Sequence, residues 1–387
     1  MTGFDFDTPV DRRGTDSLKW DRYKNRDVIP LWVADMDFQS PPSVMEALTR
    51  RVEHGVFGYS VPPDELVEVV VNRLEVKYGW RIEPEWLVWI PGLVSAIHVA
   101  CRAVGNDGDA VLTTVPVYPP FLSAPKYSRR NLIRVPLVNE NNRWIFDFDL
   151  LEDSITPSTK LLLLCSPHNP TGRLFNREEL RQIAEICERR HIIICSDEIH
   201  CDLILDEGKK HVPTASLDPE VAGRTITLMA PSKTYNIAGL GCAFAVISNP
   251  SLRRRFRLTM AGIVPDVNIM GYAAALAAYR DGNEWLEAVS KYLRSNRDAV
   301  TRAVDEMPGL SMCPVEATYL AWIDAREAGL DDAAQFFEEA GVGLSDGRDF
   351  GTEGFLRLNF ACTRSMLSDA LERMHTAIEN KIKDNAR

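Results

Sequence analysis

Residues 225–241 read TITLMAPSKTYNIAGLG. The apolar run Thr225–Met229, which contains two β-branched threonines, predicts a buried strand that ends before Pro231 and a loop of small residues. Lys233 is therefore expected at the end of a strand, where an ammonium carries a desolvation cost unless it is paired or neutralised. Imine formation neutralises a lysine, whereas a loop lysine in solvent needs no neutralisation. This stretch alone leaves both interpretations open.

Length and composition describe an ordinary globular protein that is large enough for two domains. The 387 residues carry a formal net charge of −11. Basic residues are dispersed apart from short runs such as Arg253–Arg255, which predict a solvated helix face. Nucleic acid is therefore not an expected partner.

Cysteine, histidine and apolar patterns exclude several other classes of protein. The eight cysteines contain no C-x-x-C pair and the seven histidines show no metal-binding spacing. We therefore expect reduced core cysteines and no metal site. Apolar runs are too short for a membrane span, and the first residues show no signal-peptide core. These patterns predict a cytoplasmic protein with no membrane partner.

Strands alternate with helices through the middle of the chain. We predict strands at 87–90, 110–114, 132–136, 161–165, 192–195, 225–229 and 243–248. The predicted helices are 40–53 with Ser40 as its cap, 64–78, 94–104 and 177–190, whereas PVYPPF (116–121) is predicted as a loop. This alternation implies an α/β fold with a mostly parallel sheet covered on both faces, in which ligands bind beyond the carboxyl ends of the strands.

The ends of the chain predict a second, smaller unit. A helix at 285–307 leads to predicted strands at 319–323 and 355–359 and a last helix at 365–382. We expect a three-layer large domain over 46–285 and a smaller α/β C-terminal domain over 286–387. Residues 1–45 are expected to form an extended arm and part of the small domain.

Polar side chains follow two of the predicted strands. Asp197 follows 192–195, and a buried carboxylate there needs a cation such as a protonated ring nitrogen. The alternative is a carboxylate that caps the next turn. Asn169, in SPHNPTG after 161–165, either donates its amide to a ligand oxygen or makes the turn that Asn-Pro-Thr-Gly favours.

Two further segments suit a flat, phosphorylated ligand. Tyr118 lies between the prolines of PVYPPF, so its ring is either a rigid stacking surface or a core aromatic. The turn Pro91–Gly92 begins a helix, and the free N–H groups at Leu93 and Val94 suit a phosphate, although most glycine turns bind nothing.

The order of these motifs resembles that of the fold type I enzymes that use pyridoxal 5′-phosphate (PLP), the aspartate aminotransferase superfamily. A glycine turn, an aromatic loop, N-P-T-G, S-D-E and S-K-T each follow a predicted strand, and the resemblance spans nearly the whole chain. It implies PLP as the cofactor, with Lys233 joined to its aldehyde and Asp197 beside the pyridinium nitrogen. The other implied roles are Asn169 at the phenolic oxygen, Tyr118 stacked on the ring at a catalytic position, and Ser232, Leu93 and Val94 at the phosphate.

Two more residues match this superfamily. Arg357, in GFLRLNFACTR, is similar to the arginine that grips the substrate α-carboxylate through two parallel hydrogen bonds. Tyr59, in HGVFGYS, is similar to the tyrosine that reaches the phosphate in a neighbouring subunit, which implies a homodimer with a shared active site. Without the resemblance, they would be interpreted as a surface arginine on a strand and a buried loop aromatic.

Two departures point to a subgroup. Gly241 stands where many aminotransferases carry an arginine that pairs with the phosphate, and His200 stands where they carry a tyrosine near the phenolic oxygen. SDEIHCDL, together with DRRGTDSLKWDRY, LWVADMDF and HGVFGY, resembles the MalY/PatB group of cysteine-S-conjugate and cystathionine β-lyases. The resemblance implies α,β-elimination of a sulfur amino acid to a thiol, pyruvate and ammonia.

Two other functions remain open on the same fold. An aminotransferase is the first, because a fold does not fix a reaction. A PLP-binding regulator that acts on a partner protein is the second, although an intact set of Lys233, Asp197 and Arg357 disfavours a purely binding role. The preferred thiol substituent is not predicted, because loops and a second subunit are expected to form the walls of the pocket.

Overall fold

Seven strands form the central sheet of the structure, a computed structural model that describes residues 3–385. They are β2 (Leu87–Ile90), β3 (Ala110–Val115), β4 (Asn131–Pro136), β7 (Thr159–Cys165), β8 (Ile193–Asp197), β9 (Thr225–Met229) and β10 (Ala243–Val246). The order is β2-β10-β9-β8-β7-β3-β4, and β10 alone runs antiparallel to its neighbours. Strand β9, which precedes Lys233, is buried along its whole length. The predicted mostly parallel sheet is confirmed.

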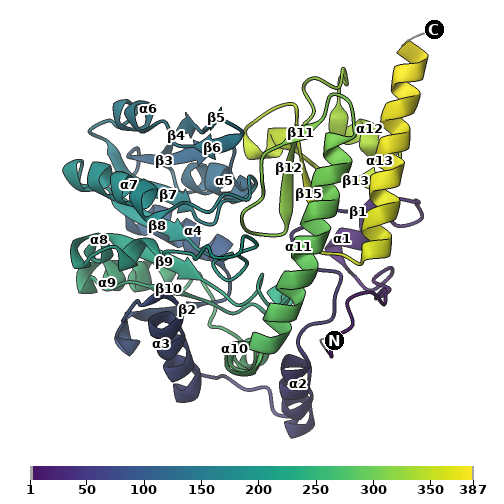
Figure 1. Ribbon diagram of the computed structural model, residues 1–387. Coiled ribbons are helices and arrows are strands. Elements are labelled where there is room, and N and C mark those ends of the chain that lie inside the picture. The colour runs from purple at the N-terminus through teal and green to yellow at the C-terminus, as the bar shows by residue number, and fades with distance from the viewer. Residues whose placement is uncertain (1–2, 386–387) are drawn as a thin grey trace.

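Helices cover both faces of this sheet (Figure 1). Leu161 and Leu163 of β7 pack in one apolar cluster with side chains of α4 (Leu93–Ala103). Leu162 and Leu164 point the other way and pack with α7 (Arg177–Arg189). Because successive strand residues face opposite sides, this alternation gives the three layers expected from the sequence. The other helices of this part are α5 (Pro119–Tyr127), α6 (Phe148–Asp153), α8 (Pro219–Gly223), α9 (Pro250–Met260) and α10 (Ile269–Asp281).

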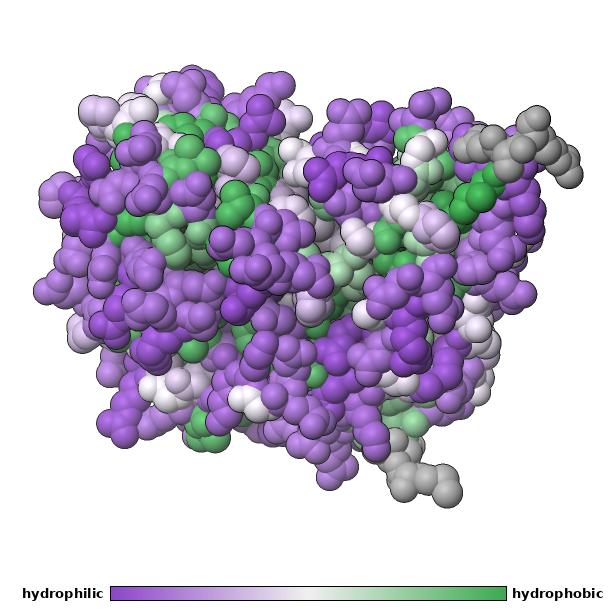
Figure 2. Space-filling view, turned by 45° about the horizontal axis from the view of Figure 1, so that its top comes forward, coloured by the Kyte–Doolittle hydropathy of each residue, from purple (hydrophilic) through white to green (hydrophobic). Residues whose placement is uncertain are grey.

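A second sheet follows the long helix α11 (Asn283–Asp305), which runs beside it in Figure 1. Its antiparallel strands lie in the order β11 (Ser311–Met312), β12 (Leu320–Asp324), β15 (Phe355–Asn359) and β14 (Ser345–Asp346). Helices α12 (Ala333–Glu339) and α13 (Arg364–Asn385) belong to this part. Figure 2 shows two lobes with a hollow between them, whose floor is less hydrophilic than its rims.

The N-terminal segment forms a two-stranded sheet of its own with a strand from the C-terminal part of the chain. Strand β1 (Ile29–Pro30) pairs in parallel with β13 (Val342–Gly343). Before and after it lie α1 (Leu18–Asp21), α2 (Pro42–His54) and α3 (Asp64–Tyr78), and a small hairpin, β5 (Val138–Glu140) and β6 (Arg143–Ile145), extends from the large sheet. The domain limits at 45/46 and 285/286 remain predictions, and their outermost residues, 1–2 and 386–387, lie outside the described part.

Several local expectations were wrong. Pro41 occupies the N-cap position of helix α2, which has no side-chain cap, and the hydroxyl of Ser40 donates to the carbonyl of Asn236 at 2.9 Å. PVYPPF is not wholly a loop, because Pro119 begins α5 in the first helical turn, where proline is tolerated. Asp197 is the last residue of β8 and does not follow it.

Helix α10 was not predicted at all. Its sequence, IMGYAAALAAYRD, is apolar nearly all round, and most of its residues are buried. A helix buried on every side shows no apolar stripe of helical period, so the pattern that predicts surface helices is absent. Helix α9 was also missed as an element. Arg254 and Arg255 on it are exposed, as expected for a solvated helix face. For Arg253 the expectation was wrong, because its side chain is largely buried and donates to the carbonyls of Ile247 and Ser248.

The described residues show reduced cysteines, no metal-binding cluster and no membrane-spanning helix. All eight cysteines are buried and none forms a disulfide. Residues 3–385 contain no cluster of His, Cys, Asp or Glu side chains placed to hold a metal ion. None of the helices in this range is both long and apolar enough to cross a membrane.

Asp202 joins helix α3 to the segment that carries Lys233. Its buried carboxylate pairs with Arg73 at 2.9 Å and with Lys77, and accepts a hydrogen bond from the Tyr78 hydroxyl at 2.6 Å. The hydroxyl of Thr234, next to Lys233, lies 3.5 Å from it. Burial opposes ionisation, but the charges of Arg73 and Lys77 prevail and hold the pKa of Asp202 well below its usual value.

Replacing Asp202 with asparagine is expected to lower the free energy of unfolding by about 3 kcal/mol, because the two cations lose their carboxylate. Urea unfolding of the cofactor-free protein at pH 7 measures this. Since the folded pKa is lowered, the contribution is present above about pH 4 and is lost as the pH falls through the folded pKa, so the two proteins converge in acid. Asp281→Asn, in an exposed pair with Arg280, is the control and should change stability by less than about 0.5 kcal/mol. Equal effects would contradict the assignment.

Candidate active site

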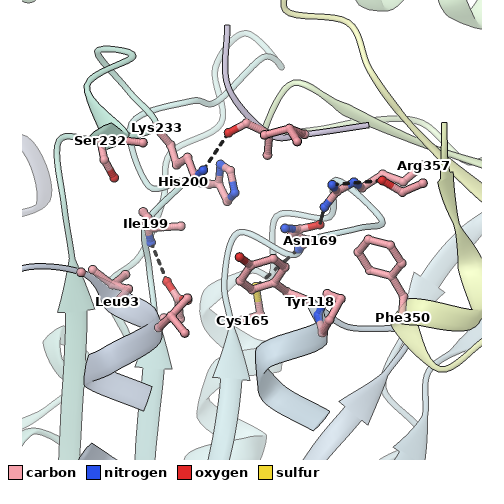
Figure 3. A pocket seen from close by; sticks show the side chains of 18 of the residues that line it. Leu93, Tyr118, Cys165, Asn169, Ile199, His200, Ser232, Lys233, Phe350 and Arg357 are labelled. Carbon is pink, nitrogen blue, oxygen red and sulfur yellow. Dashed lines mark hydrogen bonds between the residues drawn. The ribbon is translucent and has the colours of Figure 1, made fainter. Parts of the chain in front are cut away.

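A cavity of about 470 Å³ lies beyond the carboxyl ends of the parallel strands (Figure 3). It receives side chains from the large sheet, the second sheet and the N-terminal arm. It brings together all but one of the residues singled out from the sequence: Lys233, Tyr118, Asp197, Asn169, His200, Ser232, Leu93, Val94 and Arg357. Tyr59 is the exception.

Lys233 presents its amine to this cavity from the loop after β9. Its Nζ donates a hydrogen bond to the carbonyl oxygen of Ala34 at 2.7 Å. Burial lowers the pKa of Lys233 to about 8; Asp35 opposes this shift, whereas the charge of Arg357 adds to it. A lysine with a lowered pKa has a larger neutral fraction near pH 7, as a nucleophilic or basic amine requires.

Two asparagines hold the arm that supplies the Ala34 carbonyl. Asn236, at a φ of +55°, donates to the carbonyls of Met36 and Phe38 at 2.9 and 2.8 Å. Asn359 donates to the carbonyls of Val33 and Asp35 at 2.5 and 2.6 Å. Sequence reasoning missed both. The signal was an asparagine close to each key residue, in SKTYN and RLNF, since asparagine satisfies backbone groups and tolerates positive φ.

Asp37 fixes the same arm from its other side. Its buried carboxylate accepts hydrogen bonds from Lys19 at 2.6 Å, Arg12 at 2.7 Å and the Trp20 indole at 2.9 Å. The motifs DRRGTDSLKWDRY and LWVADMDF therefore meet, and their polar residues position the backbone beside Lys233.

Asp197 is a buried acid that faces the cavity. Its Oδ1 accepts a hydrogen bond from the backbone N–H of Ile199 at 3.1 Å. Burial raises the pKa of Asp197 to about 7, and the neighbouring charge of Glu198 raises it further, while the Ile199 N–H and Lys233 oppose the shift. A cationic group beside this carboxylate would stabilise its ionised form, so the position suits a protonated ring nitrogen.

Arg357 lies on β15, opposite Lys233 in Figure 3. It donates to the Asn169 side-chain oxygen at 3.1 Å, and to the Trp32 carbonyl and Ser345 hydroxyl at 2.6 and 3.3 Å. Burial lowers the pKa of Arg357 to about 10. It forms no ion pair with any carboxylate of residues 3–385, and its Nε has no hydrogen-bond partner there. A buried guanidinium in this state suits a carboxylate ligand.

Tyr118 and Asn169 form one wall of the cavity. The backbone N–H of Tyr118 donates to the Asn169 carbonyl at 3.1 Å, so the loops after β3 and β7 are joined here. Burial raises the pKa of Tyr118, so its hydroxyl stays protonated at neutral pH. The Tyr118 ring faces the space between Lys233 and Arg357 in Figure 3, where a flat ligand can stack.

Two features have free donors or acceptors that a bound cofactor can use. His200 is buried, burial lowers its pKa to about 3, and its Nδ1 has no partner within the described chain. Helix α4 begins at Leu93 after Gly92, and no side chain caps its N-terminus. These uncapped N–H groups, with Ser232 nearby on the cavity wall, suit an anion such as phosphate. The residues present therefore fit a group with an aldehyde, a basic ring nitrogen and a phosphate.

Position 241 explains one departure noted in the sequence. Gly241 has a φ of +60°, and a Cβ there would lie 3.3 Å from the carbonyl oxygen of Pro91. An arginine at this position would be strained, because a positive φ and this close contact both disfavour a residue with a Cβ.

Tyr59 lies away from the cavity and is fully exposed, at 108% of its reference area. The alternative of a buried loop aromatic is therefore wrong. Several apolar residues near it in sequence are exposed as well, namely Val52, Val56, Phe57 and Val61.

Comparisons with known proteins find similar chains of nearly the same length. The sequence profile of the family described as aminotransferase class I and II matches residues 26–374. Cystathionine beta-lyase PatB of Bacillus subtilis is 36% identical, over 96% of this chain and 99% of its own. The crystal structure of OvoB matches with 49% identity and a TM-score of 0.95, covering 97% of this chain and 99% of that one. The PLP-bound C-S lyase of Staphylococcus hominis matches with 32% identity and a TM-score of 0.91, covering 97% and 98%.

Proposed function

The chain belongs to the class I and II aminotransferase family, and on this premise we propose that it is a PLP-dependent carbon–sulfur β-lyase. It eliminates a thiol from L-cystathionine or a related cysteine conjugate and leaves pyruvate and ammonia. The observation that carries this proposal is one cavity that combines a low-pKa lysine, a buried acid and an unpaired buried arginine. The full-length likeness to a cystathionine β-lyase directs it to sulfur substrates.

Eight residues of the cavity would hold PLP. Lys233 would be the amine that joins its aldehyde, and Asp197 would keep its ring nitrogen protonated. Asn169 and His200 would bind the phenolic oxygen, Tyr118 would stack on the ring, and Ser232 with the N–H groups of Leu93 and Val94 would hold the phosphate. When bound, PLP supplies an electron sink for negative charge that develops at the substrate Cα.

The chain's own residues carry out the proton transfers and the positioning. Arg357 grips the substrate α-carboxylate through two N–H groups and thereby orients Cα. The free amine of Lys233 would remove the Cα proton as general base, to which a pKa of about 8 is well suited. The C–S bond at Cβ then breaks, its electron pair leaves with the thiolate, and water completes the release of pyruvate and ammonia.

One assay tests the reaction class. The holoenzyme is incubated with L-cystathionine in the absence of any keto acid, and pyruvate and free thiol are measured. Stoichiometric release of both supports the lyase. Turnover that requires a keto-acid acceptor would overturn it in favour of an aminotransferase, the activity that gives the matched family its name.

We further propose that the enzyme is a homodimer in which Tyr59 reaches the phosphate bound by the partner subunit. The fully exposed Tyr59 and the exposed apolar residues near it support this, since a large exposed apolar patch marks an interaction surface. The eight buried, unpaired cysteines support a reducing compartment, which we propose is the cytoplasm.

Tyr59→Phe is expected to raise the PLP dissociation constant about tenfold, because one hydrogen bond to a charged group is lost. Titration of cofactor-free protein measures this. Light scattering should still give twice the 43.5 kDa chain mass. Tyr127→Phe, another exposed tyrosine, is the control and should leave PLP affinity unchanged. A monomeric wild-type enzyme with full PLP affinity would refute the shared site.

A further inference from the structure

One charged residue of the cavity has no place in the chemistry described so far. The cavity lining contains Lys233, Asp197, His200 and Arg357, to which we assign roles, and it also contains Asp349. Asp349 lies in the short 3-10 helix Gly347–Phe350, before β15, and is exposed.

Asp349 is also the acid of this segment that lacks a partner. Arg348, the neighbouring cation, pairs with Asp332 and Asp346. Within residues 3–385, the carboxylate of Asp349 makes no hydrogen bond or ion pair. Its negative charge is therefore available to whatever enters the cavity.

Asp349 is next in sequence to a residue that packs on Arg357, and not to any of the residues proposed to hold the cofactor. The next residue, Phe350, lies with its ring 4.7 Å from the Arg357 guanidinium, and both are on the wall opposite Lys233 in Figure 3. Since Arg357 binds the substrate α-carboxylate, Asp349 belongs to the substrate side of the site. Its charge acts on Arg357 and works against the lowering of the Arg357 pKa by burial.

The cavity that Asp349 lines has both apolar and polar side chains on its walls. Asp197 and Asp349 are the carboxylates among its lining residues, and Asp197 is the one assigned to the cofactor. Because Asp349 is exposed, solvent screens its charge, so its attraction for a cation and its repulsion of an anion are expected to change an affinity about fivefold.

We propose that Asp349 selects substrates whose departing thiol carries a positive charge, so that the substrate class is cysteine conjugates with a cationic S-substituent. This rests on the proposed lyase function and deepens it. Discrimination arises from attraction to the cationic substituent and from repulsion of an anionic one.

The test uses two substrates of nearly equal size and different charge. With the holoenzyme, kcat/KM for S-(2-aminoethyl)-L-cysteine is expected to exceed that for S-propyl-L-cysteine about tenfold. Asp349→Asn should reduce this ratio about fivefold while changing kcat/KM for the propyl compound less than about twofold. Glu353→Gln removes the same charge from an exposed residue nearby that does not line the cavity, and it should leave the ratio unchanged.

A binding measurement separates this proposal from the reaction itself. L-lysine and L-2-aminoheptanoate have equal length and lack a leaving thiol, and calorimetry gives their dissociation constants. Asp349→Asn should weaken lysine about fivefold and leave aminoheptanoate unchanged. An equal effect on both ligands, or a substrate ratio unaffected by the variant, would overturn the proposal. Failure of all conjugates to yield pyruvate would overturn the lyase function instead, and the binding experiment would still decide the role of Asp349.

Discussion

Lys233→Ala is expected to lower the rate of pyruvate release at least about 10⁴-fold. The variant lacks both the amine that joins the cofactor aldehyde and the base that removes the Cα proton, and a positioned general base alone contributes up to about 10⁴-fold. It should also lose the visible absorbance that arises when the cofactor is covalently attached. Absorbance spectra and a pyruvate assay at saturating PLP measure the two effects separately.

Two control variants make this result specific. Lys126→Ala removes an exposed lysine of α5 and should retain full activity and colour. Lys233→Arg can still donate to the Ala34 carbonyl, but it remains protonated at neutral pH and should be as inactive as the alanine variant. Undiminished turnover by Lys233→Ala would refute the assignment of the catalytic base.

Asp197→Asn is expected to lower kcat/KM about 10³-fold, because the variant has no carboxylate to keep the ring nitrogen protonated while negative charge develops at Cα. The effect should fall mainly on kcat, since the charge at Cα grows in the transition state. Asp197→Glu retains the charge and should recover part of the rate. Steady-state kinetics of the three proteins measure this, and an Asp197→Asn variant with kcat near wild type would contradict the assignment.

The pH dependence of cofactor binding gives a second measure of Asp197. Burial raises the pKa of this carboxyl to about 7 in the cofactor-free protein. The group is therefore increasingly neutral as the pH falls below 7, and its attraction for a pyridinium is lost in the same range. Wild-type affinity for PLP should fall relative to that of Asp197→Asn between about pH 8 and pH 6. A constant ratio of the two affinities would show that Asp197 does not face the ring nitrogen.

Local sequence patterns were sufficient to predict the positions of the residues that lie at or after the strand ends. Lys233, Asp197 and Asn169 lie within a few residues of the ends of strongly apolar strands, and the parallel sheet brings those ends to one edge. The cavity accordingly contains all three. Their chemical roles were expected from the resemblance and remain proposals.

The same patterns could not predict contacts between residues that are far apart in the sequence. The Ala34 carbonyl meets Lys233 because Asn236 and Asn359 hold the arm from positions about 200 and 325 residues away along the chain. Asp349 reaches the cavity only because the second sheet packs against the first. Such placements depend on how distant elements dock, which neither periodicity nor turn residues encode.

The burial of the eight cysteines affects how the protein reacts with the disulfides that form from its thiol product. An enzyme that releases thiols works in the presence of the disulfides that those thiols form on oxidation. Attack on a disulfide requires a thiolate, and burial raises the pKa of every cysteine in this chain. Burial therefore keeps these thiols protonated, which is the form that does not attack a disulfide. Cys165 is the one that lines the cavity in which the thiol product is released, so its raised pKa matters most for resistance to mixed-disulfide formation.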